Sequence, residues 1–152
     1  MNVEKIESFK IDHNKLCEGI YVSRIDGDIV TYDLRTRKPN MGDFMDNATM
    51  HSVEHMIATY IRSSELAEDI IYFGPMGCQT GFYLLVRNAE NEKVLAVLKE
   101  TLEKVINHEG EVFGASQIEC GNYKNLDINL AKEECKKYLE ILNSYTPDFK
   151  YE

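Results

Sequence analysis

Two histidines and a glutamate fall within one predicted helix, and the rest of the chain has to fold around them. The segment Met50-His51-Ser52-Val53-Glu54-His55-Met56 has the pattern H-x-x-E-H. Residues four apart on a helix are separated by roughly 400° of rotation, so His51 and His55 project from the same side, one turn apart. Two neutral imidazoles in this arrangement can hold one divalent metal ion at about 2.0–2.1 Å. The carboxylate of Glu54 lies beside them, where it can act on a metal-bound water or on a substrate.

An apolar stripe predicts that this helix covers residues 49–63 and packs against a core. Asn47 and Thr49 are the candidate N-cap residues, because their side-chain oxygens can accept a hydrogen bond from a free backbone N–H. The histidines flank the stripe, so we expect them to point into the protein, where an unpaired imidazole is costly. The stripe consists of Met50, Val53, Ile57 and Ile61.

A third metal ligand has to come from elsewhere, because catalytic zinc-type sites use three protein ligands and one open position. Cys120 is the best candidate, since Gly121 after it predicts a turn and a thiolate binds zinc or ferrous iron well. His108 is the rival, although its place at the end of a predicted helix is more typical of a surface histidine facing the helix dipole. Cys17 has no clustered partner and Cys135 fits the inner face of a predicted helix, so we interpret both as structural.

Cys78 lies in a glycine-rich loop between two predicted strands, in the stretch Gly74-Pro75-Met76-Gly77-Cys78-Gln79-Thr80-Gly81. Glycines allow the backbone to bend sharply and to approach a ligand closely. A thiol in such a loop is free of core packing, whereas most free cysteines are small buried hydrophobic residues. A positive charge nearby lowers the pKa of a thiol and makes thiolate available at neutral pH. A metal ion close to this loop would therefore favour a reactive cysteine.

The order of the predicted elements indicates an α+β fold, a single domain over residues 1–152 with helices packed on a mostly antiparallel sheet. The first two strands flank Asp26-Gly27-Asp28, which predicts a hairpin. Residues 81–87 are apolar on both faces, which is typical of a central strand. The predicted strands are 20–25, 29–34, 69–73 and 81–87, and the predicted helices are 49–63, 92–108 and 126–143.

Three further segments have weaker patterns. Phe9 and Ile11 form one alternation near the start that can be buried. Residues 112–117 are ambiguous between strand and loop, and residues 145–148 are predicted to be a frayed tail.

Composition excludes several classes of partner. The 152 residues carry a formal net charge of −9, which argues against binding to nucleic acid or to an anionic membrane surface. The start of the chain has no apolar stretch behind a basic one, and no run of residues is long and apolar enough to cross a membrane. The four cysteines lack metal-knuckle or redox spacing, so we expect reduced thiols and a cytoplasmic protein.

Taken together, the motifs resemble S-ribosylhomocysteine lyase, the LuxS family. The resemblance rests on His51-Ser52-Val53-Glu54-His55, on residues 74–83 and on Glu119-Cys120-Gly121, which occur in that order and near the family spacing. It extends to Ser8-Phe9, Asp12-His13 and Asp33-Leu34-Arg35 through Pro39-Asn40, and covers about residues 4–143. The combination of a Pro-Met-Gly-Cys loop with H-x-x-E-H is highly specific to this family.

The resemblance implies a homodimeric carbon–sulfur lyase of the methyl cycle. It would split S-ribosylhomocysteine into homocysteine and 4,5-dihydroxy-2,3-pentanedione, the precursor of the quorum-sensing signal autoinducer-2. The implied metal ligands are His51, His55 and Cys120, holding ferrous iron in the cell, with zinc or cobalt as substitutes. Cys78 and Glu54 would be the acid/base pair. Substrate contacts at the subunit interface would come from Ser8, His13, Arg35 and Arg62.

The chemistry of such a reaction matches these residues. Breaking a thioether without a redox cofactor requires a carbonyl β to the sulfur, so the sugar carbonyl has to migrate from C1 to C2 to C3. Each of the two enolisations needs a Lewis acid at carbonyl and hydroxyl oxygens, which a metal supplies. Each also needs proton donors and acceptors, here Cys78 and Glu54.

One stretch departs from the family pattern. Where the family usually has an acidic residue and a serine before the loop (D-I-S-P-M-G-C), this chain has Tyr72-Phe73-Gly74. The metal and acid/base residues are unaffected. The departure leaves open how the homocysteine ammonium or the ribose hydroxyls are bound.

Two other functions are compatible with H-x-x-E-H. A metallopeptidase of the inverted-zincin class shares the pattern. It predicts an acidic third ligand, such as Glu133 or Glu134, and no role for Cys78. A non-catalytic metal-binding or regulatory domain would keep the metal ligands and leave Cys78 structural.

Overall fold

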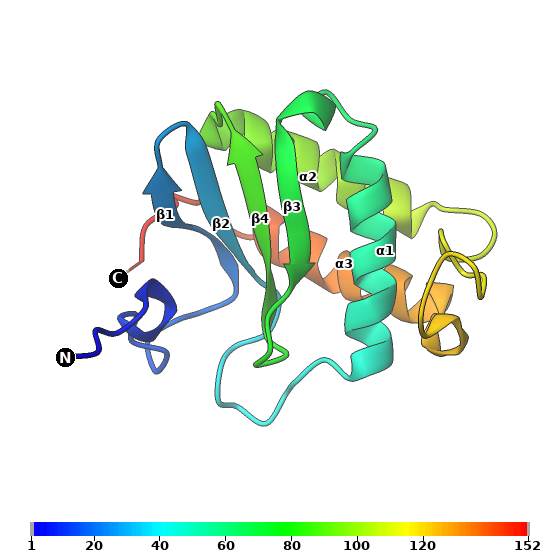
Figure 1. Cartoon of the computed structure of the whole chain (residues 1–152), viewed down its shortest axis with the longest axis horizontal. Helices are drawn as coiled ribbons and strands as arrows, with labels where there is room; N and C mark the ends of the chain where they lie inside the picture. Colours follow the sequence, from blue (N-terminus) through cyan, green and yellow to red (C-terminus); the bar gives the residue numbers. More distant parts are fainter. Residues whose placement is uncertain (1, 152) are drawn as a thin grey trace.

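Four antiparallel strands form the sheet, in the order β1-β2-β4-β3, in the computed structural model, which describes residues 2–151 (Figure 1). The hairpin expected around Gly27 is present, and Gly27 has a φ of 61°, which a residue with a side chain rarely adopts. β4 pairs with both β2 and β3, so the prediction of a central strand is confirmed. The strands are β1 Gly19–Asp26, β2 Ile29–Arg35, β3 Ile70–Pro75 and β4 Gly81–Arg87.

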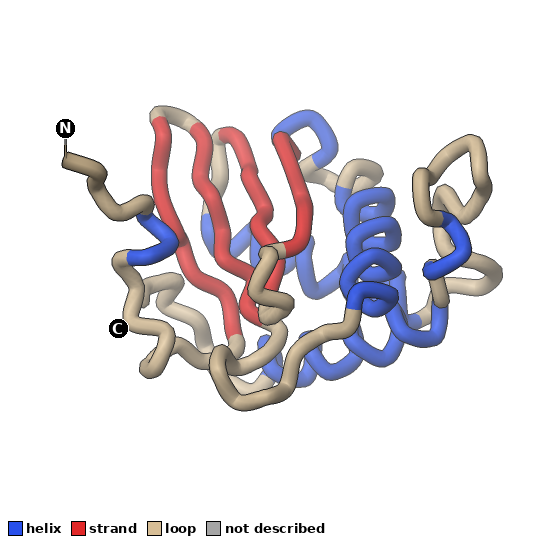
Figure 2. The backbone as a smooth tube through the Cα atoms, turned by 60° about the horizontal axis from the view of Figure 1, so that its bottom comes forward, coloured by secondary structure: helices blue, strands red, loops and turns tan. Residues whose placement is uncertain are grey.

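The helices form a second layer on one face of the sheet. Figure 1 shows α2 and α3 behind the sheet and α1 beside β3, and Figure 2 shows the same separation of helices from strands. The opposite face carries no α-helix among the described residues, so the predicted α+β class is confirmed. The helices are α1 Asn47–Ile61, α2 Asn91–Ile106 and α3 Ile128–Asn143, with short 3-10 helices at Glu7–Phe9, Ala67–Asp69 and Tyr123–Asn125.

The core lies between the sheet and the helices, where the sequence periodicities place it. Alternate residues of β4 are buried, and all four residues of the predicted α1 stripe are buried against them. Burying a side chain of this size contributes about 1.5–3 kcal/mol relative to leaving it in water. This packing fixes α1 beside β3, and therefore fixes the helix that carries both histidines. The buried residues from these two elements are Met50, Val53, Ile57, Ile61, Phe82, Leu84 and Val86.

Several local predictions were wrong. Asp46, and not Asn47 or Thr49, is the N-cap of α1, because its carboxylate accepts the Thr49 backbone N–H at 2.7 Å. Residues 112–117, whose pattern was ambiguous between strand and loop, form no strand. Phe9 is 67% exposed in the single chain, so the predicted burial of the Phe9–Ile11 alternation fails for its aromatic member.

The predicted frayed tail is also wrong, because the chain after α3 packs along β1. The phenol oxygen of Tyr145 accepts the backbone N–H of Ile20 at 3.0 Å. The carbonyl of Phe149 accepts the N–H of Val22 at 2.8 Å, and the Phe149 ring is buried. The unpaired edge of β1 thus gives the tail a hydrogen-bonding partner that local sequence does not reveal.

Candidate metal centre

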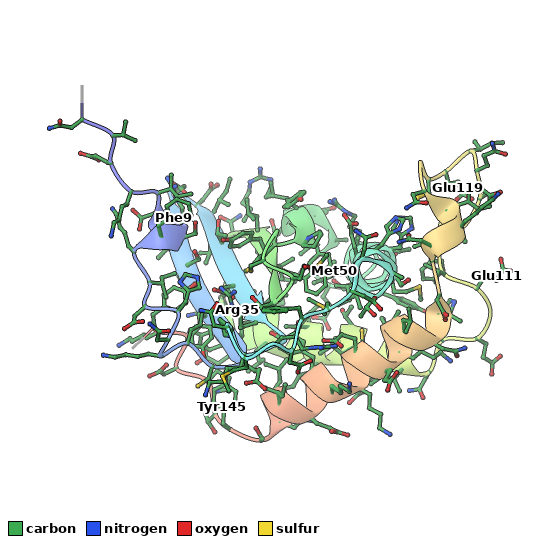
Figure 3. All side chains as sticks on the ribbon, turned by 90° about the horizontal axis from the view of Figure 1, so that it is seen from below. Phe9, Arg35, Met50, Glu111, Glu119 and Tyr145 are labelled. Carbon is green, nitrogen blue, oxygen red and sulfur yellow. The ribbon has the colours of Figure 1, made fainter. Side chains whose placement is uncertain are left out.

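His51, His55 and Cys120 come together at one point between α1 and the loop that precedes α3. One ligand atom from each residue can be chosen so that all lie within 4.8 Å of one another. The His51 Nε2 lies 3.3 Å from the Cys120 sulfur, and the two imidazole rings lie edge to face with centroids 4.6 Å apart. In Figure 3 this loop, marked by Glu111 and Glu119, stands beyond α1 on the side away from β1. Two nitrogens and a sulfur at these separations fit a zinc-type or ferrous ion with one position left for substrate.

The imidazole of His51 is oriented by an amide pair. Asn125 donates from Nδ2 to the Asn47 side-chain oxygen at 2.7 Å, so its own carbonyl oxygen faces the ring. Nδ1 of His51 donates to that oxygen, and Nε2 is left as the lone-pair nitrogen that a metal needs. Asn47 belongs to the first turn of α1, so the same helix carries His51 and the side chain that orients Asn125 toward it.

His55 is oriented in the same way, by a backbone carbonyl. Its Nδ1 donates to the carbonyl of Phe113 at 2.8 Å, which again leaves Nε2 for a metal. Gly114 comes close to this ring, since a Cβ there would lie 3.2 Å from the His55 Nδ1. The Phe113 ring packs edge-on against Tyr60 and His108, which fixes the loop against α1.

His108, the rival third ligand, is engaged elsewhere. Its Nε2 donates to the carbonyl of Glu111 at 2.8 Å, so its Nδ1 accepts the hydroxyl of Tyr60 at 2.7 Å. Both ring nitrogens are therefore used, and the residue is half-buried rather than the exposed surface histidine that its position predicts. It supports the loop that carries Cys120.

The Cys120 sulfur is held by its own turn. Its backbone N–H donates to the carbonyl of Ser116 at 3.1 Å, and the N–H of Asn122 donates to the sulfur at 3.4 Å. This contact fixes the position of the sulfur within the turn. Ser52, fully buried on α1, accepts the N–H of Asp127 at 2.8 Å and joins the start of α3 to the same helix.

Cys78 lies in a second cluster with Arg35 and Thr80. The sulfur is 3.0 Å from the Thr80 hydroxyl oxygen, and NH1 of Arg35 reaches Thr80 at 2.8 Å and the sulfur at 3.7 Å. Cys78 is exposed, so the alternative of a small buried hydrophobic residue is wrong. A permanent positive charge, rather than only a metal, therefore faces this thiol.

Arg35 is held in place by Asp33 on the same strand face. Its Nε and NH2 donate to the two carboxylate oxygens of Asp33, at 3.1 and 2.6 Å, and both residues are almost fully buried. Burial alone would lower the pKa of the Arg35 guanidinium, but the charge and hydrogen bonds of Asp33 raise it. Gly81 is opposite Arg35 in the sheet, where a Cβ would come within 2.5 Å of the Leu34 carbonyl oxygen.

The loop of Cys78 is joined to the residue that precedes α1. Met45 donates its N–H to the Gln79 carbonyl at 3.0 Å, and the Gln79 side-chain amide donates to the Met45 carbonyl at 2.9 Å. Gln79 has a φ of 66°, which turns the loop toward this contact. Through these bonds the loop of Cys78 is attached to the residue just before the N-cap of α1. Cys78 itself does not belong to the group of His51, His55 and Cys120.

Comparison with known proteins identifies the family of the chain. A sequence model of the S-ribosylhomocysteinase (LuxS) family matches residues 6–147. The chain belongs to this family. An S-ribosylhomocysteine lyase of Finegoldia magna is 46% identical, covering 93% of this chain and 94% of that protein. Proteins of the same name from Borreliella afzelii (93% of this chain, 94% of that protein) and Phocaeicola vulgatus (98% and 97%) are 45% and 43% identical.

The substrate contacts that the LuxS resemblance suggested do not belong to the group of His51, His55 and Cys120, whereas Glu54 shares the helix of the two histidines. Ser8 lies near Tyr83 and lines a groove of about 310 Å³ on the face of the sheet that carries no α-helix. The ring of His13 is hydrogen-bonded to the Ile11 carbonyl at 2.9 Å. Arg62 caps the far end of α1 and is exposed. Glu54 is half-buried on α1, between the two histidines in sequence.

The departure from the LuxS loop pattern has a steric explanation. A Cβ at Gly74 would collide with the Tyr72 hydroxyl and lie 2.5 Å from the adjacent ring carbon. The Tyr72 phenol therefore fills the space that a serine side chain would need at position 74. The two replacements fit each other, and either one alone would leave a clash or a gap.

Sequence reasoning missed the residues that orient the ligands. Asn125, Asn47 and the Phe113 carbonyl lie in irregular segments or at a helix start, where no periodicity marks them. Thr80 was part of the loop motif, but its contact with Arg35 depends on the pairing of β2 with β4. The one sequence feature that could have pointed to Asn125 is that it is a polar residue a few positions after Cys120.

Replacing Asn125 by alanine should weaken metal binding by about 10–100-fold, the usual effect of removing a hydrogen-bond partner of a metal-bound histidine. Without the amide oxygen, the His51 ring loses the bond that fixes its tautomer and orientation. A competition titration with a metal-binding dye measures the affinity. Asn122→Ala is the matched control, since only its backbone contacts the sulfur; equal affinities for the two variants would contradict the assigned role.

Proposed function

We propose that this protein cleaves S-ribosylhomocysteine to homocysteine and 4,5-dihydroxy-2,3-pentanedione, which links the methyl cycle to autoinducer-2 synthesis. Two findings support the proposal together. One is membership of the LuxS family over nearly the whole chain. The other is the presence of both the group of His51, His55 and Cys120 and an exposed thiol, Cys78, that contacts Arg35. The reaction is a net elimination. A C–S bond breaks, protons move between carbons and oxygens, and no external oxidant or reductant is needed.

In this proposal the protein side chains move the protons. Cys78 is poised to take a proton from a sugar carbon, because Arg35 and Thr80 contact its sulfur and can stabilise negative charge there. Glu54 lies on the histidine helix and would carry protons between substrate oxygens and the carbon skeleton. A bound metal would supply Lewis acidity, and His51, His55 and Cys120 would hold it.

The peptidase alternative lacks its third ligand. Glu134 is almost fully buried and accepts two hydrogen bonds from Arg37, at 2.9 and 2.5 Å, so its carboxylate is already committed. Glu133 is exposed and does not belong to the group of potential metal ligands. Nothing in the site therefore favours hydrolysis of peptides over cleavage of a thioether.

Incubating the cobalt-loaded protein with S-ribosylhomocysteine tests the proposal directly. Homocysteine release appears as free thiol, measured against the same protein without substrate. Well-folded, metal-loaded protein that releases no thiol would exclude the lyase function.

For the metal we propose ferrous iron, with zinc and cobalt as substitutes. Imidazole nitrogens and a thiolate can bind all three ions, so these ligands do not by themselves select one metal. Ferrous iron exchanges oxygen ligands readily in a site that must accept several substrate oxygens in turn. Metal analysis of protein purified without oxygen should find iron, and zinc alone in such protein would contradict this choice.

We also propose a homodimer in which a second copy covers the face of the sheet that carries no α-helix. The groove there is lined by Ser8, Tyr72 and Tyr83, and exposed Phe9 lies beside it. Large apolar side chains on an open sheet face are typical of an interface. The mass in solution should be twice the 17.5 kDa of one chain. Phe9→Glu should dissociate the dimer and Phe9→Leu should not; a monomeric wild type would contradict the proposal.

A cytoplasmic location is proposed from the cysteines. All four thiols are free, and the cytoplasm keeps thiols reduced. No helix in residues 2–151 has the length and apolar character needed to span a membrane. Cell fractionation tests the location, and recovery outside the cytoplasmic fraction would contradict it.

A further inference from the structure

The C-terminal tail continues past the family match, which ends at residue 147, and returns to the sheet. The backbone hydrogen bond between Val22 and Phe149 carries it along β1. The Phe149 ring then packs edge-on against Tyr32, with centroids 6.4 Å apart. Two residues later the Tyr151 ring stacks on Tyr21, with centroids 5.1 Å apart and planes 15° from parallel. Backbone, apolar and aromatic contacts therefore fix the position of Tyr151.

The hydroxyl of Tyr151 reaches the buried carboxylate that holds Arg35. It donates to Oδ2 of Asp33 at 2.7 Å, and NH2 of Arg35 donates to the same oxygen at 2.6 Å. Asp33 is 1% exposed, so these protein donors take the place of water around its charge. Burial, and then the charge of Asp33, raise the pKa of Tyr151, so the hydroxyl remains a proton donor at neutral pH.

The hydrogen bonds continue from Arg35 to Cys78. Because Nε and NH2 of Arg35 are held by Asp33, NH1 is the nitrogen directed at Thr80 and at the Cys78 sulfur. The contacts thus run from Tyr151 through Asp33 and Arg35 to the thiol, and every intermediate group is almost fully buried. Figure 3 shows Arg35 in the lower part of the sheet, toward the side where the tail passes near Tyr145.

We infer that Tyr151 is a positioning residue for the reactive thiol of Cys78 and acts through Asp33 and Arg35. The inference rests on the proposed function only in giving Cys78 a catalytic role. Without the phenol, Arg35 is the one side-chain donor left to Asp33 among the described residues, and the guanidinium is drawn toward the carboxylate. The contact between Arg35 and the sulfur then lengthens, and the thiol reacts more slowly with an alkylating agent.

Alkylation by iodoacetamide measures this effect without any turnover. The cobalt-loaded protein is treated at pH 7, and mass spectrometry follows the rate at Cys78 and at exposed Cys17 separately. Tyr151→Phe keeps the ring stacked on Tyr21 and removes only the hydroxyl. We expect the rate at Cys78 to fall about 3–10-fold and the rate at Cys17 to stay the same, in line with the loss of one charge-assisted hydrogen bond.

Tyr145→Phe is the matched control, because it removes another tail hydroxyl that binds a backbone N–H rather than Asp33. It should leave the rate at Cys78 unchanged, while both variants lower the thermal midpoint to a similar extent. An unchanged rate in Tyr151→Phe, or equal slowing in both variants, would overturn the inference. A wild type that alkylates normally but releases no homocysteine would instead refute the proposed function and leave the inference standing.

Discussion

Replacing Cys78 by alanine is expected to abolish homocysteine release and leave the metal content unchanged. The sulfur is exposed beside Arg35 and Thr80 and is not part of the three-atom group that could hold a metal. Under the proposed function, its removal therefore takes away a proton carrier and no metal ligand. Removing a general acid/base group typically lowers the rate by about 10²–10⁴-fold. Free-thiol release and metal analysis on the same preparation measure the two quantities together.

Cys17→Ala is the matched control for this variant, since Cys17 is also exposed and also free. It removes one reactive thiol from the background of the assay and should retain near wild-type activity. A Cys78→Ala protein that still releases homocysteine at the wild-type rate would assign the proton transfers to Glu54 alone. If metal were lost as well, Cys78 would have to act as a ligand.

The parts of this protein that periodicity determines were predictable from the sequence. The α1 stripe and the alternation along β4 specify which faces are buried, and burial then sets the fold class. The H-x-x-E-H pattern on a helix places two histidines on one side whatever surrounds it. The sequence also pointed to Cys120 as a candidate ligand, because a turn and a thiol are the two features that a distant ligand needs, and the structure brings it to the two histidines.

The remaining parts depend on contacts between segments far apart in the chain. The support of His51 by Asn125 joins positions 74 residues apart, and the bond of Tyr151 to Asp33 joins positions 118 apart. No local pattern encodes such pairs. The tail looked frayed because its residues have no apolar period, yet the open edge of β1 and one buried carboxylate give it partners.

Cys120→Ala is expected to lower metal affinity by more than the roughly 10–100-fold that removal of a supporting residue costs, because a ligand itself is lost. The two histidines remain on α1, but a site with only two protein ligands holds a divalent ion weakly. Wild-type protein should gain thermal stability on addition of cobalt, since a ligand that binds only the folded state stabilises it. The variant should gain little or none.

A cobalt titration monitored by thermal unfolding measures both effects, with Cys17→Ala as the thiol control. Unchanged stoichiometry and affinity in Cys120→Ala would remove this residue from the ligand set.

His108 would then be the next candidate, but both of its ring nitrogens are hydrogen-bonded, to Tyr60 and to the Glu111 carbonyl. It would have to give up one of these bonds to bind metal. His108→Ala should therefore loosen the loop and lower the thermal midpoint, while metal still binds one ion per chain through His51, His55 and Cys120.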